Sequence, residues 1–319
     1  MKAAVVSSFD TPPQYADFAD PTPQAGELLV HVHASALAPV VRSLAAGKHY
    51  GSKAQFPLIA GIDGTGTLED GSRVYFAATR PPCGAMAERT LTTTDRILRL
   101  PEHLDEATVA ALMNPGMSSA GALSERAHFQ RGESVLIQGA TGTAGRLAVQ
   151  ICRRRGASRV VATGRDQQAL EELRALGADA VIPLNQDRPA LVSAFRDALN
   201  ENKIDVILDY LWGAPAEALL DAIAQKGLEH QSRRIRFVQI GSAAGLTITL
   251  PGATLRSSGL ELLGSGFGSV SIEKIFAALA AFLEEAGREP FKVNFQTAPL
   301  ADVEKLWNQK TDARLVFQP

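Results

Sequence analysis

The pattern of hydrophobic and polar positions changes about two fifths of the way along the chain. From Ser134 onward, short apolar runs alternate with stretches in which apolar residues recur at intervals of three and four. The runs are typical of strands and the longer period is typical of amphipathic helices. The predicted strands are 134–138, 159–163, 180–184, 204–210, 234–240 and 260–263, and the predicted helices are one behind Gly145, 168–176, 190–199 and 214–225. This alternation indicates βαβ units that form a parallel sheet with helices on both faces.

The part before Ser134 is predicted to be rich in strands and less regular. Strands are expected at 2–6, 27–36, within 56–76 and within 81–90, with a short helix ending near Gly47. In L-L-V-H-V-H the alternation places Val30 and Val32 on one face and His31 and His33 on the other. Two histidines on one strand face could bind a metal ion. Because no cysteine and no third histidine lie nearby in the sequence, we favour a half-exposed sheet face.

Helical periodicity also appears at the junction of the two parts and near the C-terminus. It begins near Asp105, resumes from Ser118 to Ala127, and returns in a long helix over 271–286. The tail after this helix is strand-like again, and we expect it to return to the first domain.

Composition narrows the class of protein. A chain of 319 residues suggests one large or two medium domains, and 45% hydrophobic residues with 21% charged ones are ordinary for a globular protein. The net charge of −2 gives no general attraction to nucleic acid or to an anionic membrane. The two cysteines, Cys83 and Cys152, cannot form a disulfide framework or a zinc knuckle, and Cys152 is expected in the core. With no secretory signal and no long apolar span, we expect a cytoplasmic protein.

One glycine-rich turn offers the clearest chemistry in the sequence. It follows the strand 134–138 and precedes a helical pattern, and it consists of Gly139, Ala140, Thr141, Gly142, Thr143, Ala144 and Gly145. Glycines let backbone N–H groups approach a pyrophosphate, and the positive end of the following helix favours the same anion. The string therefore predicts a dinucleotide site, because it stands between a strand and a helix as the mechanism requires. The alternative is a tight strand-to-helix connection that binds no ligand.

The end of the second strand in this part indicates which dinucleotide binds. An acidic residue there would bind the ribose hydroxyls of NAD, whereas a small residue followed by arginine accommodates the 2′-phosphate of NADP. The strand ends in Gly164, Arg165 and Asp166. Gly164 leaves room, Arg165 can bind phosphate, and Asp166 is interpreted as the cap of the next helix. We therefore expect NADPH rather than NADH.

Six segments, in order along the chain, resemble the medium-chain dehydrogenase/reductase superfamily and, within it, the zinc-free quinone oxidoreductases related to zeta-crystallin. They are F-P-L-I-A-G-I-D-G-T-G (56–66), C-G-A-M-A-E (83–88), G-E-S-V-L-I-Q-G-A-T-G-T-A-G (132–145), L-G-A-D-A-V-I (176–182), I-D-V-I-L-D-Y-L-W-G (204–213) and A-D-V-E-K-L-W (301–307). The resemblance implies an α/β protein in which a GroES-like β-barrel carries a Rossmann domain with a doubly wound, parallel, six-stranded sheet. The corresponding boundaries are 1–115 for the barrel, 116–267 for the Rossmann domain, and 268–319 for a segment that returns to the barrel.

The resemblance also implies that the zinc ligands of related enzymes are missing. Their three catalytic ligand positions match Ala38, Ile62 and Asn114 in this chain, and none is a usual zinc ligand. Cys83 stands alone where zinc-dependent members carry a structural four-cysteine lobe. We therefore expect no metal.

The same resemblance nominates further site residues. Ser118 and Asn114 are expected near the cofactor, and two loops are expected to pass over the nicotinamide and its ribose, namely Gly241 with Ser242 and Gly264, Ser265 and Gly266. Tyr50 matches a tyrosine near the substrate pocket and could donate a hydrogen bond to a carbonyl, and His49 beside it could relay a proton. The alternative is that Tyr50 only packs or binds passively. Relatives usually carry asparagine at Ala38, followed by proline and aspartate, and A-L-A-P-V-V-R lacks both polar groups.

These observations favour a zinc-independent, NADPH-dependent reductase of quinones or α,β-unsaturated carbonyls. A conjugated acceptor fits because, without a Lewis acid, delocalisation must stabilise the charge that hydride transfer creates. Two alternatives stay open: a zinc-free carbonyl or alcohol oxidoreductase, and an NADPH-binding sensor or scaffold with little turnover. The expected partners are a small-molecule quinone or enone and a second copy of the chain, because relatives dimerise through the last Rossmann strand, here 260–264. Neither nucleic acid nor a membrane is expected as a partner.

Overall fold

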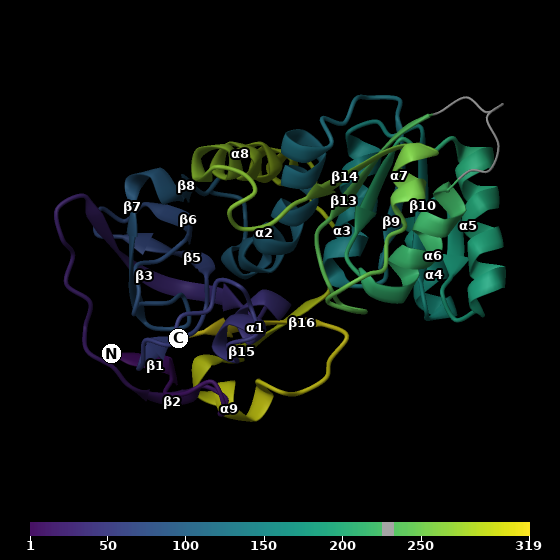
Figure 1. Cartoon of the computed structure of the whole chain (residues 1–319). Coiled ribbons are helices and arrows are strands. Elements are labelled where there is room, and N and C mark those ends of the chain that lie inside the picture. The colour runs from purple at the N-terminus through teal and green to yellow at the C-terminus, as the bar shows by residue number, and fades with distance from the viewer. Residues whose placement is uncertain (225–232) are drawn as a thin grey trace. The chain divides into compact units, whose positions relative to one another are not determined.

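The computed structural model describes residues 1–224 and 233–319, and these residues form two compact units (Figure 1). The first unit contains Met1–Pro115 and Ala280–Pro319, and the second contains Gly116–Leu279. The domain boundaries expected from the sequence, 115/116 and 267/268, remain our proposal. In the described part of the chain, no helix is both long and apolar enough to cross a membrane.

The first unit is built mainly from antiparallel strands. A three-stranded sheet has the order β2-β1-β4, and a larger sheet has the order β15-β16-β3-β5-β6-β8, with β7 also paired to β3. The strands are β1 (Lys2–Val6), β2 (Gln14–Asp17), β3 (Glu27–Ala36), β4 (Leu58–Ile59), β5 (Asp63–Leu68), β6 (Arg73–Ala77), β7 (Arg89–Thr93), β8 (Ile97–Arg99), β15 (Phe295–Pro299) and β16 (Arg314–Gln318). Among the shorter helices are α1 (Pro39–Ala45) and α9 (Val303–Leu306).

The two histidines of β3 lie on the sheet face that the alternation predicted. Val30 and Val32 are buried, whereas His31 is exposed. His33 is half-buried, and its Nδ1 lies 2.5 Å from Oε2 of Glu106, a carboxylate that also accepts from Nε of Arg73 at 2.8 Å. His33 is thus engaged in a hydrogen-bonded network within the first unit, here named the barrel unit after the GroES-like barrel that the resemblance implies. Among residues 1–224 and 233–319, no group of three His, Cys, Asp or Glu side chains is placed to hold a metal ion.

The second unit contains a six-stranded parallel sheet with the strand order β11-β10-β9-β12-β13-β14. The strands are β9 (Ser134–Gln138), β10 (Arg159–Gly164), β11 (Ala180–Pro183), β12 (Val206–Asp209), β13 (Arg234–Gln239) and β14 (Gly259–Gly264). The helices between them are α3 (Thr143–Arg154), α4 (Gln167–Ala175), α5 (Arg188–Asn202), α6 (Gly213–Ile223) and α7 (Gly252–Arg256). The prediction of a doubly wound α/β sheet is therefore confirmed. The strand order reverses between β9 and β12, which is where ligands bind in sheets of this kind.

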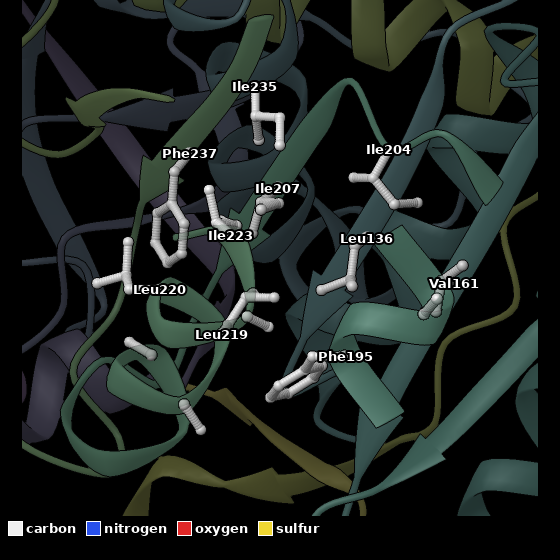
Figure 2. Close-up of a cluster of buried hydrophobic side chains, with 14 of the residues drawn as sticks. Leu136, Val161, Phe195, Ile204, Ile207, Leu219, Leu220, Ile223, Ile235 and Phe237 are labelled. Atoms are coloured by element: carbon white, nitrogen blue, oxygen red, sulfur yellow. The ribbon is translucent and has the colours of Figure 1, made fainter. Parts of the chain in front are cut away.

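The core of this unit joins the sheet to α5 and α6. Figure 2 shows Phe195 of α5 and Leu219 of α6 beside Leu136, Val161 and Ile207 of three neighbouring strands. The side chain of Phe195 is fully buried, which contributes roughly 1.5–3 kcal/mol relative to exposure. The residues that alternate with Leu136 along β9 are buried too, as expected when helices cover both faces of a parallel sheet.

The long helices differ from the sequence prediction at their ends and at one proline. The predicted helices near 105 and over 118–127 form one helix, α2 (Glu106–Gly121), with Pro115 inside it, followed by a π-helical turn, Ala122–Arg126. The predicted separation was wrong, because the helix continues through Pro115 although proline lacks the N–H of a helical hydrogen bond. The predicted helix 271–286 is α8 (Ile272–Arg288). The predicted end of α6 at Gln225 lies outside the described residues.

The connection from β9 to α3 is shaped by glycines that have no room for a side chain. A Cβ at Gly145 would lie 2.4 Å from the Cα of Ala140 and 2.6 Å from the carbonyl oxygen of Gly139. Both atoms belong to the backbone, so neither can move aside without displacing the turn. At Gly142, by contrast, the nearest atom to a Cβ would be 3.9 Å away.

We therefore predict that Gly145→Ala lowers the free energy of unfolding by about 1–3 kcal/mol, because it overpacks the turn. Gly142→Ala is the matched control, since the same methyl group meets open space there, and it should cost less than about 0.5 kcal/mol. Chemical denaturation followed by circular dichroism measures both values. Equal losses in the two variants would contradict this explanation of the turn.

Candidate functional site

The glycine turn presents backbone N–H groups at the start of α3. Gly139 has a φ of +79°, a left-handed conformation that favours glycine, and a Cβ there would lie 2.8 Å from Leu211. Gly142 is the extended N-cap residue of α3, and the first helical hydrogen bond runs from the N–H of Arg146 to its carbonyl oxygen. The N–H groups of the first helical turn have no partner within a helix. The turn therefore has the geometry that an anionic pyrophosphate requires.

Two hydrogen bonds fasten the turn to the end of β10. The N–H of Gly139 donates to Oγ1 of Thr163 at 3.1 Å, and the N–H of Ala140 donates to the carbonyl oxygen of Thr163 at 2.8 Å. A Cβ at Gly164 would lie 2.4 Å from Cγ2 of Thr141. A side chain at position 164 would therefore collide with the turn. The structure brings the glycine turn and the end of β10, the two predicted cofactor segments, into contact.

The polar residues after Gly164 have separate roles. The carboxylate of Asp166 accepts from the N–H of Ala169 at 2.7 Å and caps α4, as predicted. One of its carboxylate oxygens is therefore engaged at the helix start. The side chain of Arg165 is exposed next to this cap. A second cation, Arg146, donates to the carbonyl oxygen of Thr141 at 3.1 Å and to Glu172 at 2.7 Å, and the sequence interpretation did not include it.

The end of β12 carries a buried carboxylate, Asp209, and the backbone of the same residue contacts the segment after β13. Oxygen atoms of the Asp209 side chain accept from the N–H groups of Leu211 at 2.9 Å and Trp212 at 3.1 Å, while the N–H of Gly241 donates to its carbonyl oxygen at 3.1 Å. Burial raises the pKa of Asp209 to about 6, although the two N–H groups lower it. A Cβ at Gly241 would lie 2.7 Å from the carbonyl oxygen of Tyr210. Gly241 is therefore held against the end of β12.

Ser118 lies close to the same strand end. The hydroxyl oxygen of Tyr210 lies 2.7 Å from Oγ of Ser119 and 3.4 Å from Oγ of Ser118. The sequence interpretation missed Tyr210. Its position directly after a strand at the point where the strand order reverses is a signal that could have found it. Asn114 lies one helical turn before Ser118 on α2, and its side chain is partly exposed.

The loop after β14 contains the remaining predicted cofactor residues. The N–H of Ser265 donates to the carbonyl oxygen of Gln239 at 2.8 Å, and the N–H of Gly266 donates to Oγ of Ser269 at 2.8 Å. Gly264 ends the strand, and Ser242 is exposed in the loop after β13. All these segments follow the carboxyl ends of parallel strands, so they belong to one edge of the sheet. Their contact with a cofactor stays a prediction.

The barrel unit contains a cavity of about 890 Å³ with a largely apolar wall. Its wall comes from α1, the segment 51–62 and the segment 78–83, and includes Val41, Leu58, Ile62, Phe56 and Pro82. Polar groups are few there, among them the amine of Lys53 and the thiol of Cys83, whose pKa burial raises. A cavity of this size suits a small organic molecule.

The predicted catalytic pair precedes the segment that forms this wall. The rings of His49 and Tyr50 lie 4.1 Å apart, and the Tyr50 side chain is 73% exposed. The N–H of Gly51 donates to Nδ1 of His49 at 3.0 Å, so the neutral ring carries its proton on Nε2. Burial lowers the pKa of His49, which favours this neutral form. Neither His49 nor Tyr50 is among the described residues that line the cavity. The nearest lining residue in the sequence is Gly51.

The three positions that match zinc ligands offer no zinc-binding atoms. Ala38 is fully buried, and the partly buried Ile62 packs against the same apolar cluster of the barrel unit. Asn114 supplies only an amide. The side chains present therefore do not fit a catalytic zinc ion.

Comparison with known proteins places the chain among oxidoreductases. The family described as zinc-binding dehydrogenase matches residues 144–285. A probable NADPH-dependent quinone reductase of Emericella nidulans is 28% identical, with all of both chains covered. The quinone oxidoreductase of Sus scrofa is 29% identical over 91% of this chain and 85% of its own length.

Solved structures agree with this placement. The quinone oxidoreductase of Thermus thermophilus, a structure reported together with its NADPH complex, is 27% identical and superimposes with a TM-score of 0.82, with both chains covered completely. The order of the sheet, the glycine turn and these similarities lead to one conclusion. The chain is similar to the quinone oxidoreductases of the medium-chain dehydrogenase/reductase superfamily, and these similarities support a place in that branch.

Proposed function

We propose that this chain is an NADPH-dependent reductase that passes hydride to a quinone or another conjugated carbonyl compound without a zinc ion. The observation that supports this proposal is that the chain has a dinucleotide-binding turn but lacks side chains that bind zinc at the positions matched to zinc ligands. The dinucleotide turn is complete, whereas the positions that would hold a catalytic zinc are Ala38, Ile62 and Asn114, of which the first two pack against one apolar cluster. The names of the similar proteins, which include NADPH-dependent quinone reductase, support the same activity.

The residues of the second unit bind and orient the cofactor in this proposal. The turn from Gly139 to Gly145 holds the pyrophosphate, and Arg165 holds the 2′-phosphate. Ser118, together with the loops at 241–242 and 264–266, orients the nicotinamide and its ribose. Asn114, which precedes this unit on α2, is proposed to contact the cofactor as well. Bound NADPH supplies the hydride itself.

The residues of the barrel unit receive the acceptor. The largely apolar wall of the cavity can pack against a flat ring. The hydroxyl of Tyr50 donates a hydrogen bond to the acceptor's carbonyl oxygen, and neutral His49 donates through Nε2. Because a hydrogen bond polarises a carbonyl less than a zinc ion does, the acceptor must stabilise the developing charge by conjugation.

We also propose a homodimer and a cytoplasmic location. β14 is the last strand at one edge of the six-stranded sheet, and Leu262 on it is 38% exposed. An open strand edge with an exposed apolar side chain can pair with the same edge of a second copy. Light scattering should give twice the 33.9 kDa mass of one chain, and the mass of a single chain would contradict the dimer.

NADPH oxidation against matched acceptors tests the activity. We expect cyclohexenone and a naphthoquinone to exceed saturated cyclohexanone in kcat/KM by on the order of 100-fold, or about 2.7 kcal/mol, because only the first two delocalise the transferred charge. Equal rates with the saturated ketone would favour a carbonyl reductase. Tight NADPH binding without turnover of any acceptor would favour a binding protein.

Cofactor choice is tested at Arg165. Arg165→Ala should raise the dissociation constant for NADPH about 10- to 100-fold, because a charge-assisted hydrogen bond to phosphate contributes about 1.5–3 kcal/mol. The dissociation constant for NADH should stay within about twofold, since NADH lacks that phosphate. Arg196→Ala, which removes an exposed arginine of α5, is the control and should change neither value. Titration of nicotinamide fluorescence measures all of them, and equal losses for both cofactors would refute the assignment.

A further inference from the structure

Tyr210 joins three segments of the second unit that we assign to the cofactor. Its N–H donates to the carbonyl oxygen of Gln138 at 3.2 Å, directly before the glycine turn. Its carbonyl oxygen is 2.7 Å from where a Cβ of Gly241 would lie, and its own Cβ is 3.5 Å from where that of Gly139 would lie. Its side chain extends to the two serines at the end of α2. A displacement of this residue would therefore disturb all three segments.

The two hydrogen bonds of the phenol are unequal. Ser119 is fully buried, and its hydroxyl oxygen lies at 2.7 Å, a normal distance for such a bond. Ser118 is only partly buried, and its hydroxyl oxygen lies at the longer distance of 3.4 Å. The short bond to Ser119 anchors the tyrosine ring, and the longer contact is the one that links the ring to Ser118.

The Tyr210 hydroxyl is not suited to move a proton. Burial raises its pKa to about 12, although the two serines lower it. It therefore stays protonated at physiological pH, where it acts as a fixed hydrogen-bonding group. A phenol with one proton and two acceptor sites can contact both serines at once, whereas phenylalanine would leave the buried Ser119 without this partner.

We propose that Tyr210 is a positioning residue that holds Ser118, and with it the nicotinamide, in the orientation from which hydride leaves. This inference rests on the proposed function and adds a residue to its site. Tyr210 acts through Ser118 and through the adjoining backbone, and it needs no contact with the acceptor.

A double-mutant cycle of Tyr210→Phe and Ser118→Ala tests the inference. Each single variant should raise the dissociation constant for NADPH and lower kcat by about tenfold, the size expected for the loss of one buried hydrogen bond. The double variant should be no worse than either single variant, because both changes remove the same positioning. The KM of the acceptor should remain unchanged.

Tyr75→Phe is the matched control. Tyr75 is a fully buried tyrosine of the barrel unit, and its hydroxyl donates to Oδ2 of Asp63 at 2.9 Å. The control removes the same atom from a buried site and should lower the melting temperature, as Tyr210→Phe does, while NADPH binding stays within about twofold of the wild type.

The outcomes separate this inference from the function on which it rests. Wild-type protein that binds NADPH but reduces no acceptor would refute the proposed reductase activity. The double-mutant cycle would then test the role of Tyr210 through the dissociation constants for NADPH alone. Multiplicative effects in the double variant, or a Tyr210→Phe change confined to the melting temperature, would show that Tyr210 only packs. A wild type that does not bind NADPH would overturn both proposals.

Discussion

The close approach of two backbone segments in the glycine turn is the constraint on which the second unit depends. The chain leaves β9, turns through Gly139 in a left-handed conformation, and returns so tightly that Gly145 lies against Ala140. Thr163 at the end of β10 accepts from the same turn. Helix α3 can therefore begin next to the point where the strand order reverses, and its N-terminus faces the edge of the sheet where a dinucleotide can bind.

The barrel unit contains a cavity with a largely apolar wall. Val41 and Ile62 line its cavity, and Ala38 is buried in the cluster against which Ile62 packs. Two of the three positions that the resemblance matches to zinc ligands, Ala38 and Ile62, carry hydrocarbon side chains. Chemistry in such a surrounding depends on how the cofactor and the acceptor are positioned, because the wall itself supplies little polarisation. In the proposed mechanism, the residues that orient the nicotinamide are therefore as important as those that contact the acceptor.

Local patterns in the sequence predicted the regular parts of the structure. The six strands, the order typical of a dinucleotide sheet, the cap at Asp166 and the burial of Cys152 all follow from short-range periodicity or from the resemblance, and the structure confirms them. The continuity of α2 through Pro115 was not predicted, because proline is a local break signal and only the folded surroundings can keep the helix intact.

The features of the site that the sequence did not predict depend on contacts between residues that are distant along the chain. Tyr210 meets Ser119 across 91 positions of the sequence, and no spacing rule connects two such residues. The cavity of the barrel unit likewise gathers segments around positions 18, 41, 56 and 82. The sequence could thus nominate Ser118 through its resemblance to relatives and Tyr210 through its place after a strand, but it could not predict that their side chains contact each other.

The central claim is that the bound nicotinamide and the surrounding side chains suffice for the reaction without a metal ion. The most direct test measures the zinc content of the purified protein together with its NADPH-dependent quinone reduction, before and after treatment with a strong chelator. The account predicts less than about one tenth of a zinc ion per chain and full activity after chelation. One zinc ion per chain, with activity lost on chelation and restored by added zinc, would contradict it.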